Sequence, residues 1–342
     1  MPAGTRENTI GPNRRSLLTA AGVAIAAASL PSAAAAPAPE GGAFWTKEYW
    51  AAKGAVKLNL YRKQQNAPVQ GQSALPVLLL VHGSSISSRP SFDLTVPGAG
   101  EYSLMNVFAR NGYDVWTMDF EGYGRSTATA GNSDIKSGVE DLKAATKIIV
   151  QETGRQKFHF WGESSGALRA AAFATQAPER IDRLILGAFT YTGKGSPTLA
   201  DRAKQLDFYR THNRRPRDIE MIRSIFTRDK PGTSDSRVAE AMAAAELPFG
   251  DSVPTGTYLD MSANLPVVDP KKVKAPVLMV HGQYDGIATE EDILDFFRQL
   301  PSPDRQLAIL PGLAHSLAMG LNRQELWHVA EAFLSLPHPK IV

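Results

Sequence analysis

The stretch WGESSG, residues 161–166, decides the fold of this chain. An apolar, aromatic segment at residues 158–160 precedes it, and an alanine-rich helical segment follows it. Glycine at positions 162 and 166 suits a sharp turn, because larger side chains there would collide with the strand and helix that the turn joins. The stretch therefore predicts a strand, a tight turn that exposes Ser164 as a nucleophile, and a helix.

Short apolar runs recur along the chain and alternate with longer segments of helical pattern. The apolar runs begin at Pro76, Tyr113, Lys157, Arg183, Pro276 and Gln306, and an alternating run from Val56 is typical of an edge strand. The helical patterns lie at residues 103–112, 138–154, 165–180, 290–301 and 322–336. Alternation of this kind predicts an α/β fold in which helices cover both faces of a mostly parallel sheet.

One interval, residues 191–270, lacks a strong strand pattern and instead carries helical stretches at 199–212, 217–226 and 236–246. It is too long for an ordinary loop in a compact domain. We expect a helical cap inserted at 191–270, which divides the core into a first part at 37–190 and a second part at 271–342.

Residues 1–36 have the pattern of a signal peptide. Arg14 and Arg15 precede an apolar run at 17–30, and small residues near Ala34 and Ala36 suit a signal peptidase. We expect export by a twin-arginine route, so that the mature protein is periplasmic or secreted; the alternative is a cytoplasmic protein with a disordered Ala/Pro tail. N-terminal sequencing of the exported protein should give a start near Pro37, and an intact Met1 would contradict export.

Composition excludes several classes of function. The chain has no cysteine, which rules out thiolate nucleophiles, disulfides and cysteine-based metal sites. The formal charge of +3 falls to +1 without the leader, so a nucleic-acid partner is not expected, and the basic cluster at 213–217 is typical of a solvated face. No later apolar run approaches the roughly 18 residues of a membrane span. Phosphate-loop, dinucleotide, zinc and calcium motifs are absent, so we expect no cofactor and no metal.

A serine nucleophile needs a base, and His315 is the best placed of seven histidines. It follows the last apolar run, on a loop that contains glycine. By contrast, His82 and His281 each stand in VHG at the end of an apolar run, where a histidine commonly braces a turn.

The base needs an orienting acid, for which Asp285 is the best candidate. It lies in HGQYDG just past an apolar run, although Asp-Gly is also a common turn dipeptide. The order Ser164, Asp285, His315 is the one expected for a serine nucleophile on this architecture. The alternative acids are Asp201 and Asp207, in the expected cap.

Several motifs together resemble the α/β-hydrolase superfamily, from about Val56 to Leu336. They are HGSS at 82–85, DFEGYGRS at 119–126, GESSGALRAAAFATQAPERIDRLIL at 162–186, VLMVHGQYDGIA at 277–288 and LPGLAHS at 310–316. The resemblance implies a serine esterase or lipase-like member with a helical cap. It also implies an oxyanion hole formed by the backbone N–H groups of Ser84 and Ser165, with Ser85 as the alternative to Ser84. Two positions depart from the family pattern: Glu121 replaces an arginine, and Glu163 replaces the common histidine.

Three functions follow as hypotheses. The first is hydrolysis of a small-molecule or polymer-derived carboxylic ester through an acyl-enzyme. The second is hydrolytic carbon–carbon cleavage of a diketone, because HGSS resembles the HGSG of such hydrolases. The third is an inactive exported binding protein, against which the complete Ser, Asp and His set argues. Cap residues could line the substrate pocket or form the cap's own core; these are Tyr191, Phe208, Tyr209, Phe226, Phe249, Tyr258 and Met261.

Overall fold

An eight-stranded sheet forms the centre of the computed structural model, which describes residues 43–337; the predicted leader at 1–36 lies outside them. The strand order is β1-β2-β4-β3-β5-β6-β9-β10. The pairs β1·β2 and β2·β4 are antiparallel, and all other neighbouring strands are parallel. The strands are β1 (Trp45–Lys53), β2 (Val56–Gln64), β3 (Val77–Val81), β4 (Asp114–Met118), β5 (Phe158–Glu163), β6 (Ile181–Gly187), β9 (Val277–Tyr284) and β10 (Arg305–Ala314).

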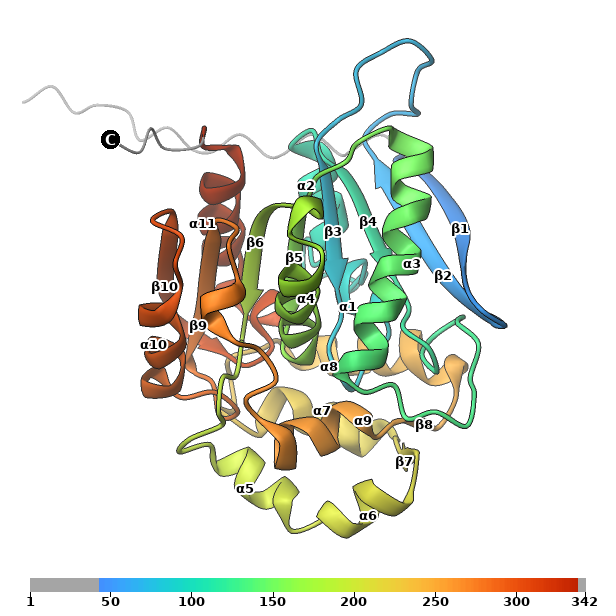
Figure 1. Ribbon diagram of the computed structural model, residues 1–342. Coiled ribbons are helices and arrows are strands. Elements are labelled where there is room, and N and C mark those ends of the chain that lie inside the picture. The colour runs from blue at the N-terminus through green and yellow to red at the C-terminus, as the bar shows by residue number, and fades with distance from the viewer. Residues whose placement is uncertain (1–42, 338–342) are drawn as a thin grey trace, which may run out of the picture. The chain divides into compact units, whose positions relative to one another are not determined.

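Helices cover both faces of the sheet, which explains why the inner strands are continuously apolar. Leu79 and Val81 pack on one face with α3 (Ile135–Thr153), α4 (Ser165–Gln176) and α10 (Glu290–Gln299). Alternate residues such as Leu78 and Leu80 pack on the other face with α2 (Leu104–Arg110) and α11 (Arg323–Ser335). Figure 1 shows α3 and α4 side by side in front of the sheet. The predicted mostly parallel α/β fold is therefore confirmed.

The segment between β6 and β9, called the insertion below, gathers beyond one end of the sheet (Figure 1). It contains α5 (Pro197–Ala203), α6 (Leu206–Thr211), α7 (Ile219–Thr227), α8 (Ser236–Glu246) and α9 (Gly256–Leu259), and a hairpin of β7 (Arg214–Pro216) and β8 (Ser252–Pro254). The remaining short elements are α1 (Ser88–Phe92), the 3₁₀ turns Pro178–Arg180, Leu247–Phe249, Pro270–Lys272 and Leu317–Met319, and a π turn at Asp260–Asn264. In the part of the chain that the structure describes, no helix is long and apolar enough to cross a membrane.

Two local expectations were wrong. The strand from Val56 is not an edge, because β1 pairs along its outer side. The alternation of β1 is interrupted, since the exposed Trp50 lies on its outward face and Lys47 on its inward face. The expected helix at 199–212 is two helices, α5 and α6, with a break at Lys204 and Gln205. The expectation that the interval lacks a strong strand agrees with the hairpin of β7 and β8, whose strands have only three residues each.

A buried ion pair within the insertion also bonds to the loop that follows β3. The side chains of Arg217 and Glu246 contact each other and are at most 2% exposed. Glu246 accepts hydrogen bonds from the backbone N–H of Ser87 at 3.0 Å and from its hydroxyl at 2.5 Å. Arg217 also donates to the carbonyl oxygen of Ser85 at 3.2 Å. These three hydrogen bonds to charged side chains attach the insertion to the loop after β3.

Candidate active site

Ser164 lies at the tip of the turn between β5 and α4, in a strained backbone conformation. Its φ of 57° and ψ of −127° fall in a region that residues other than glycine rarely adopt. A side chain at position 162 would collide with the carbonyl oxygen of Gly166, and one at position 166 with that of Val81. The two glycines of the motif are therefore required by close packing of strand, turn and helix.

The structure brings together the three side chains that the sequence singled out. The Nε2 atom of His315 lies 2.9 Å from Oγ of Ser164. The Nδ1 atom of the same ring lies 2.8 and 2.9 Å from the two carboxylate oxygens of Asp285. These contacts join three loops, each at the carboxyl end of a parallel strand, where the α/β architecture gathers such residues. The arrangement lets the imidazole accept a proton from the serine while the carboxylate orients it.

Asp285 is fixed as an ionised acceptor. Its Oδ1 accepts the backbone N–H groups of Ile287 at 2.8 Å and Ala288 at 3.0 Å. Burial alone would raise the pKa of Asp285, but the charge of His315 and these hydrogen bonds lower it below its usual value. The carboxylate is therefore available to hold the Nδ1–H of His315.

The loop after β3 presents the N–H of Ser84 close to the serine turn. His82 accepts the N–H of Phe120 at Nε2 (3.2 Å), so its Nδ1 carries the proton and donates to the carbonyl oxygen of Gly83 at 2.8 Å. In a trans peptide the N–H points opposite the carbonyl, so the N–H of Ser84 is directed away from His82. Burial lowers the pKa of His82 to about 3, which keeps it neutral as a brace, as its sequence position suggested.

The backbone N–H of Ser165 has no partner within the helix, because Ser165 is the first residue of α4, so it is available to donate to an oxyanion at Ser164. A chain of hydroxyls links it to the insertion: Thr257 donates to Ser84, and Ser84 donates to Ser165, each at 2.8 Å. Tyr123 donates to the carbonyl oxygen of Ser84 at 2.9 Å. Sequence reasoning missed Thr257 and Tyr123, and no pattern marks them; Thr257 lies 173 positions from its partner.

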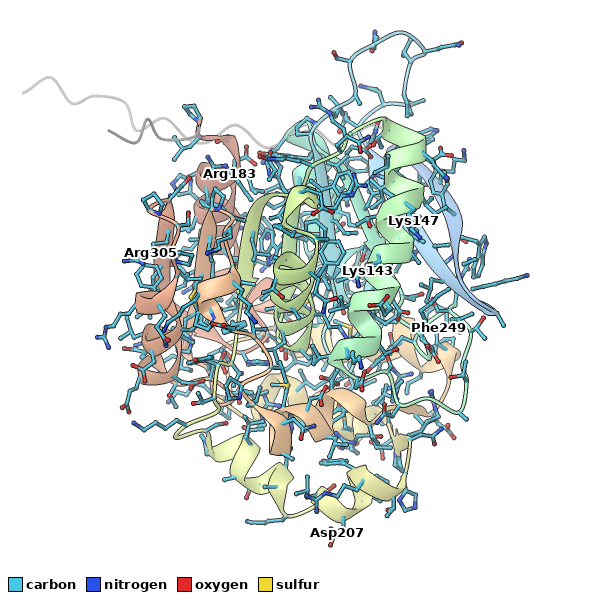
Figure 2. All side chains as sticks on the ribbon, in the orientation of Figure 1. Lys143, Lys147, Arg183, Asp207, Phe249 and Arg305 are labelled. Carbon is cyan, nitrogen blue, oxygen red and sulfur yellow. The ribbon has the colours of Figure 1, made fainter. Side chains whose placement is uncertain are left out.

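A cavity of about 100 Å³ opens above Ser164 and His315. Its apolar wall comes from the loop after β3, from the insertion and from the turn after His315, and includes Ile86, Phe226, Met242 and Met319. Of the expected cap aromatics only Phe226 lines it. Figure 2 shows Phe249 on the insertion, away from the centre of the molecule, and Tyr209 and Tyr258 are buried among the core side chains.

The alternative acids lie outside the site. Figure 2 shows Asp207 at the outer edge of the insertion, and its side chain is 99% exposed. The side chain of Asp201 is 75% exposed and pairs with Lys204. The alternative oxyanion donor, Ser85, does line the catalytic cavity, and its hydroxyl hydrogen-bonds to that of Tyr258 at 2.7 Å. Among residues 43–337, no group of three or more His, Asp or Glu side chains is placed to hold a metal ion.

The two departures from the family pattern have different surroundings. Glu121 lies outside the catalytic cavity and pairs with Lys53 at 2.7 Å. Glu163 lines the cavity, and its Oε1 is buried with no hydrogen-bond partner among the described residues. Burial raises the pKa of Glu163 to about 8, so it is a neutral carboxylic acid near pH 7.

Glu163 should make the protein less stable as the pH rises. In the unfolded chain this carboxyl loses its proton near pH 4.5, whereas in the fold it keeps the proton until about pH 8. The unfolded state binds fewer protons across this window, so the free energy of unfolding falls with pH, by about 1–3 kcal/mol for a partly buried group. Thermal melts should show this loss in the wild type and not in Glu163→Gln. The exposed control Glu140→Gln should follow the wild type, and parallel curves for all three proteins would contradict the prediction.

Comparison with known sequences identifies similarity over most of the chain. The model of the Hydrolase_4 family, described as serine aminopeptidase S33, matches residues 97–321, about two thirds of the chain. A 2-hydroxy-6-oxononadienedioate/2-hydroxy-6-oxononatrienedioate hydrolase of Paraburkholderia phymatum is 32% identical over 116 residues, which cover 32% of this chain and 34% of that protein. The matched part spans about a third of the length of the curated relatives.

Solved structures show the same fold. A 2-hydroxy-6-oxo-6-phenylhexa-2,4-dienoate hydrolase of Rhodococcus sp. strain RHA1 has a TM-score of 0.61 at 19% identity, over 86% of this chain and 100% of that one. A thermophilic esterase of Thermogutta terrifontis has a TM-score of 0.59 at 20% identity, over 84% of this chain and 98% of that one. At these identities the likeness concerns the fold alone.

Proposed function

The chain belongs to the serine aminopeptidase (S33) family within the α/β-hydrolase superfamily, and we propose that it hydrolyses a carboxylic ester through Ser164, His315 and Asp285. The observation that carries the proposal is the 2.9 Å contact between Nε2 of His315 and Oγ of Ser164, with Asp285 on the opposite nitrogen. A serine hydroxyl is a weak nucleophile at neutral pH, and this arrangement supplies the base that it lacks.

The reaction proceeds in two acyl transfers. Oγ of Ser164 attacks the ester carbonyl carbon while its proton passes to Nε2 of His315. The N–H groups of Ser84 and Ser165 donate to the negative oxygen of the tetrahedral intermediate. Collapse of the intermediate breaks the carbon–oxygen bond, and the leaving alcohol takes the proton from His315. Water, deprotonated by the same imidazole, then attacks the acyl-enzyme and releases the acid and free Ser164.

Carbon–carbon hydrolysis of a diketone is the second candidate. It is favoured by the 32% identity to the P. phymatum hydrolase, although that match covers only about a third of either chain. The same three side chains would serve it, and the leaving group would be a ketone instead of an alcohol. An inactive binding protein is the least supported of the three functions, because the hydrogen-bonded Ser164, His315 and Asp285 would serve no purpose in it.

Matched substrates and a serine-directed probe test the proposal. The purified protein should release the alcohol from p-nitrophenyl esters, and a fluorophosphonate should label it at Ser164. Release of a ketone from a diketone, without ester turnover, would favour the second candidate. If the protein is not labelled and turns over neither substrate, the inactive binding protein is the only one of the three functions left. Export, proposed on residues 1–36 alone, is independent of these outcomes.

A further inference from the structure

A second cavity, of about 400 Å³, adjoins the catalytic cavity on the side of the insertion. The two share a wall formed by Ser85, Arg202, Ile225 and Arg228. Arg202, in the last turn of α5, therefore faces both the space above Ser164 and the space beyond it. A substrate group in either cavity can therefore contact this guanidinium.

Arg202 is a partly buried cation without an acidic partner. Within residues 43–337 its guanidinium makes no hydrogen bond and no ion pair, and its contact is with the ring of Tyr258, at 5.1 Å from Cζ to the ring centroid. Arg215, which also lines the second cavity, lies at 4.6 Å over the same ring and likewise has no acidic partner in this part of the chain. Burial, together with the charges of Arg228 and Arg215, lowers the pKa of Arg202, but arginine stays charged at neutral pH.

The nearby acids do not compensate this charge. Asp229 pairs with Arg228 at 2.7 Å and also accepts the backbone N–H of His315 at 3.2 Å. Asp201 pairs with Lys204 in solvent. Glu163, on the core side of the catalytic cavity, forms no ion pair with Arg202 and is neutral near pH 7. The shared wall thus carries excess positive charge in a poorly solvated place, which is unfavourable unless an anion binds there.

We infer that the two adjoining cavities bind an ester whose acyl or alcohol part carries a carboxylate, and that Arg202 holds this carboxylate. The inference rests on the proposed function and adds the class of substrate to it. A guanidinium binds a carboxylate through two parallel N–H···O hydrogen bonds, which fix orientation as well as position. With the carboxylate on Arg202, the remainder of the molecule extends toward Ser164, in the catalytic cavity that the two residues share.

Two esters that share a leaving group, and differ only in whether the acyl part carries a carboxylate, test the inference for the acyl part of the substrate. The wild type should hydrolyse mono-p-nitrophenyl glutarate with a kcat/KM about 10–100 times that for p-nitrophenyl butyrate. Phenyl acetate and 3-acetoxybenzoate share an acetyl group and differ only in a carboxylate on the leaving phenol, so they test the inference for the alcohol part. In Arg202→Gln the preference for the anionic ester should fall toward unity, and Arg202→Lys should restore part of it. Arg210→Gln, an exposed arginine of α6, is the matched control and should keep the wild-type preference.

A binding measurement separates this inference from the proposed function. Calorimetry on Ser164→Ala should show that glutarate binds, and that adding Arg202→Gln weakens its Kd at least about tenfold. Anion binding at Arg202 without ester turnover would contradict the proposed function and leave the anion site standing. The anion site would be overturned if the wild type hydrolysed the neutral and the anionic ester of each pair equally well. It would also be overturned if Arg202→Gln lowered kcat/KM equally for the neutral and the anionic ester. Either result would leave ester hydrolysis standing.

Discussion

Replacing Ser164 with alanine is expected to lower kcat for a p-nitrophenyl ester by about 10⁴–10⁶. The change removes the only atom that can form the acyl-enzyme, while the N–H groups of Ser84 and Ser165 and the cavity remain. The residual rate should therefore exceed that of the uncatalysed reaction by about 10³, the share that binding and oxyanion stabilisation supply without a nucleophile. Initial rates with excess purified protein measure this residual rate.

Folding must be shown to be intact for this result to bear on mechanism. The φ of 57° at position 164 is strained for alanine and serine alike, so the melting temperature should change little. Ser335→Ala, an exposed serine at the end of α11, is the matched control and should keep wild-type turnover. Substantial ester hydrolysis by a well-folded Ser164→Ala protein would rule out the serine mechanism, whichever bond the natural substrate presents.

Replacing Asp285 with asparagine is expected to lower kcat by about 10⁴. The reason lies in the backbone around the carboxylate. Oδ1 already accepts the N–H groups of Ile287 and Ala288, so an asparagine must turn its oxygen to them and its NH₂ toward His315. That NH₂ donates to Nδ1 and thereby places the ring proton on Nε2, where it blocks proton transfer from Ser164.

The tautomer explanation predicts more than a loss of rate. A fluorophosphonate should label Asp285→Asn much more slowly than the wild type, because labelling needs the same proton transfer. Asp207→Asn, at the exposed outer edge of the insertion, should label and turn over like the wild type. If Asp285→Asn lost less than about tenfold in kcat, the carboxylate would not be the group that orients His315.

The chemistry at the sheet edge could be predicted from sequence because each of its parts is local. Ser164 stands between two glycines, at positions where any side chain would collide with neighbouring backbone. Asp285 and His315 each follow a strand directly. A residue at the carboxyl end of a parallel strand is placed by the sheet itself, so chain order and strand pattern suffice.

The residues that hold the loop of Ser84 in place, and those that line the pocket, could not be predicted in the same way. Thr257 reaches Ser84 across 173 positions, and Arg202 faces the catalytic cavity because of how the insertion packs. No periodicity encodes such contacts. The edge strand β1 was missed because Trp50 on its exposed face and Lys47 on its inward face interrupt the alternation. The split between α5 and α6 has no evident cause in the residues at 204 and 205.

The hydrogen bonds of Glu246 and Arg217 to the loop after β3 restrain the helices α7 and α8. Swinging these helices outward as a rigid lid would part Glu246 from Ser87 and Arg217 from the carbonyl oxygen of Ser85, in the very loop that carries Ser84. Hydrogen bonds to charged groups contribute about 1.5–3 kcal/mol each, so such an open state is unfavourable. Motion of α7 and α8 is therefore mechanically coupled to the loop that serves the catalytic serine.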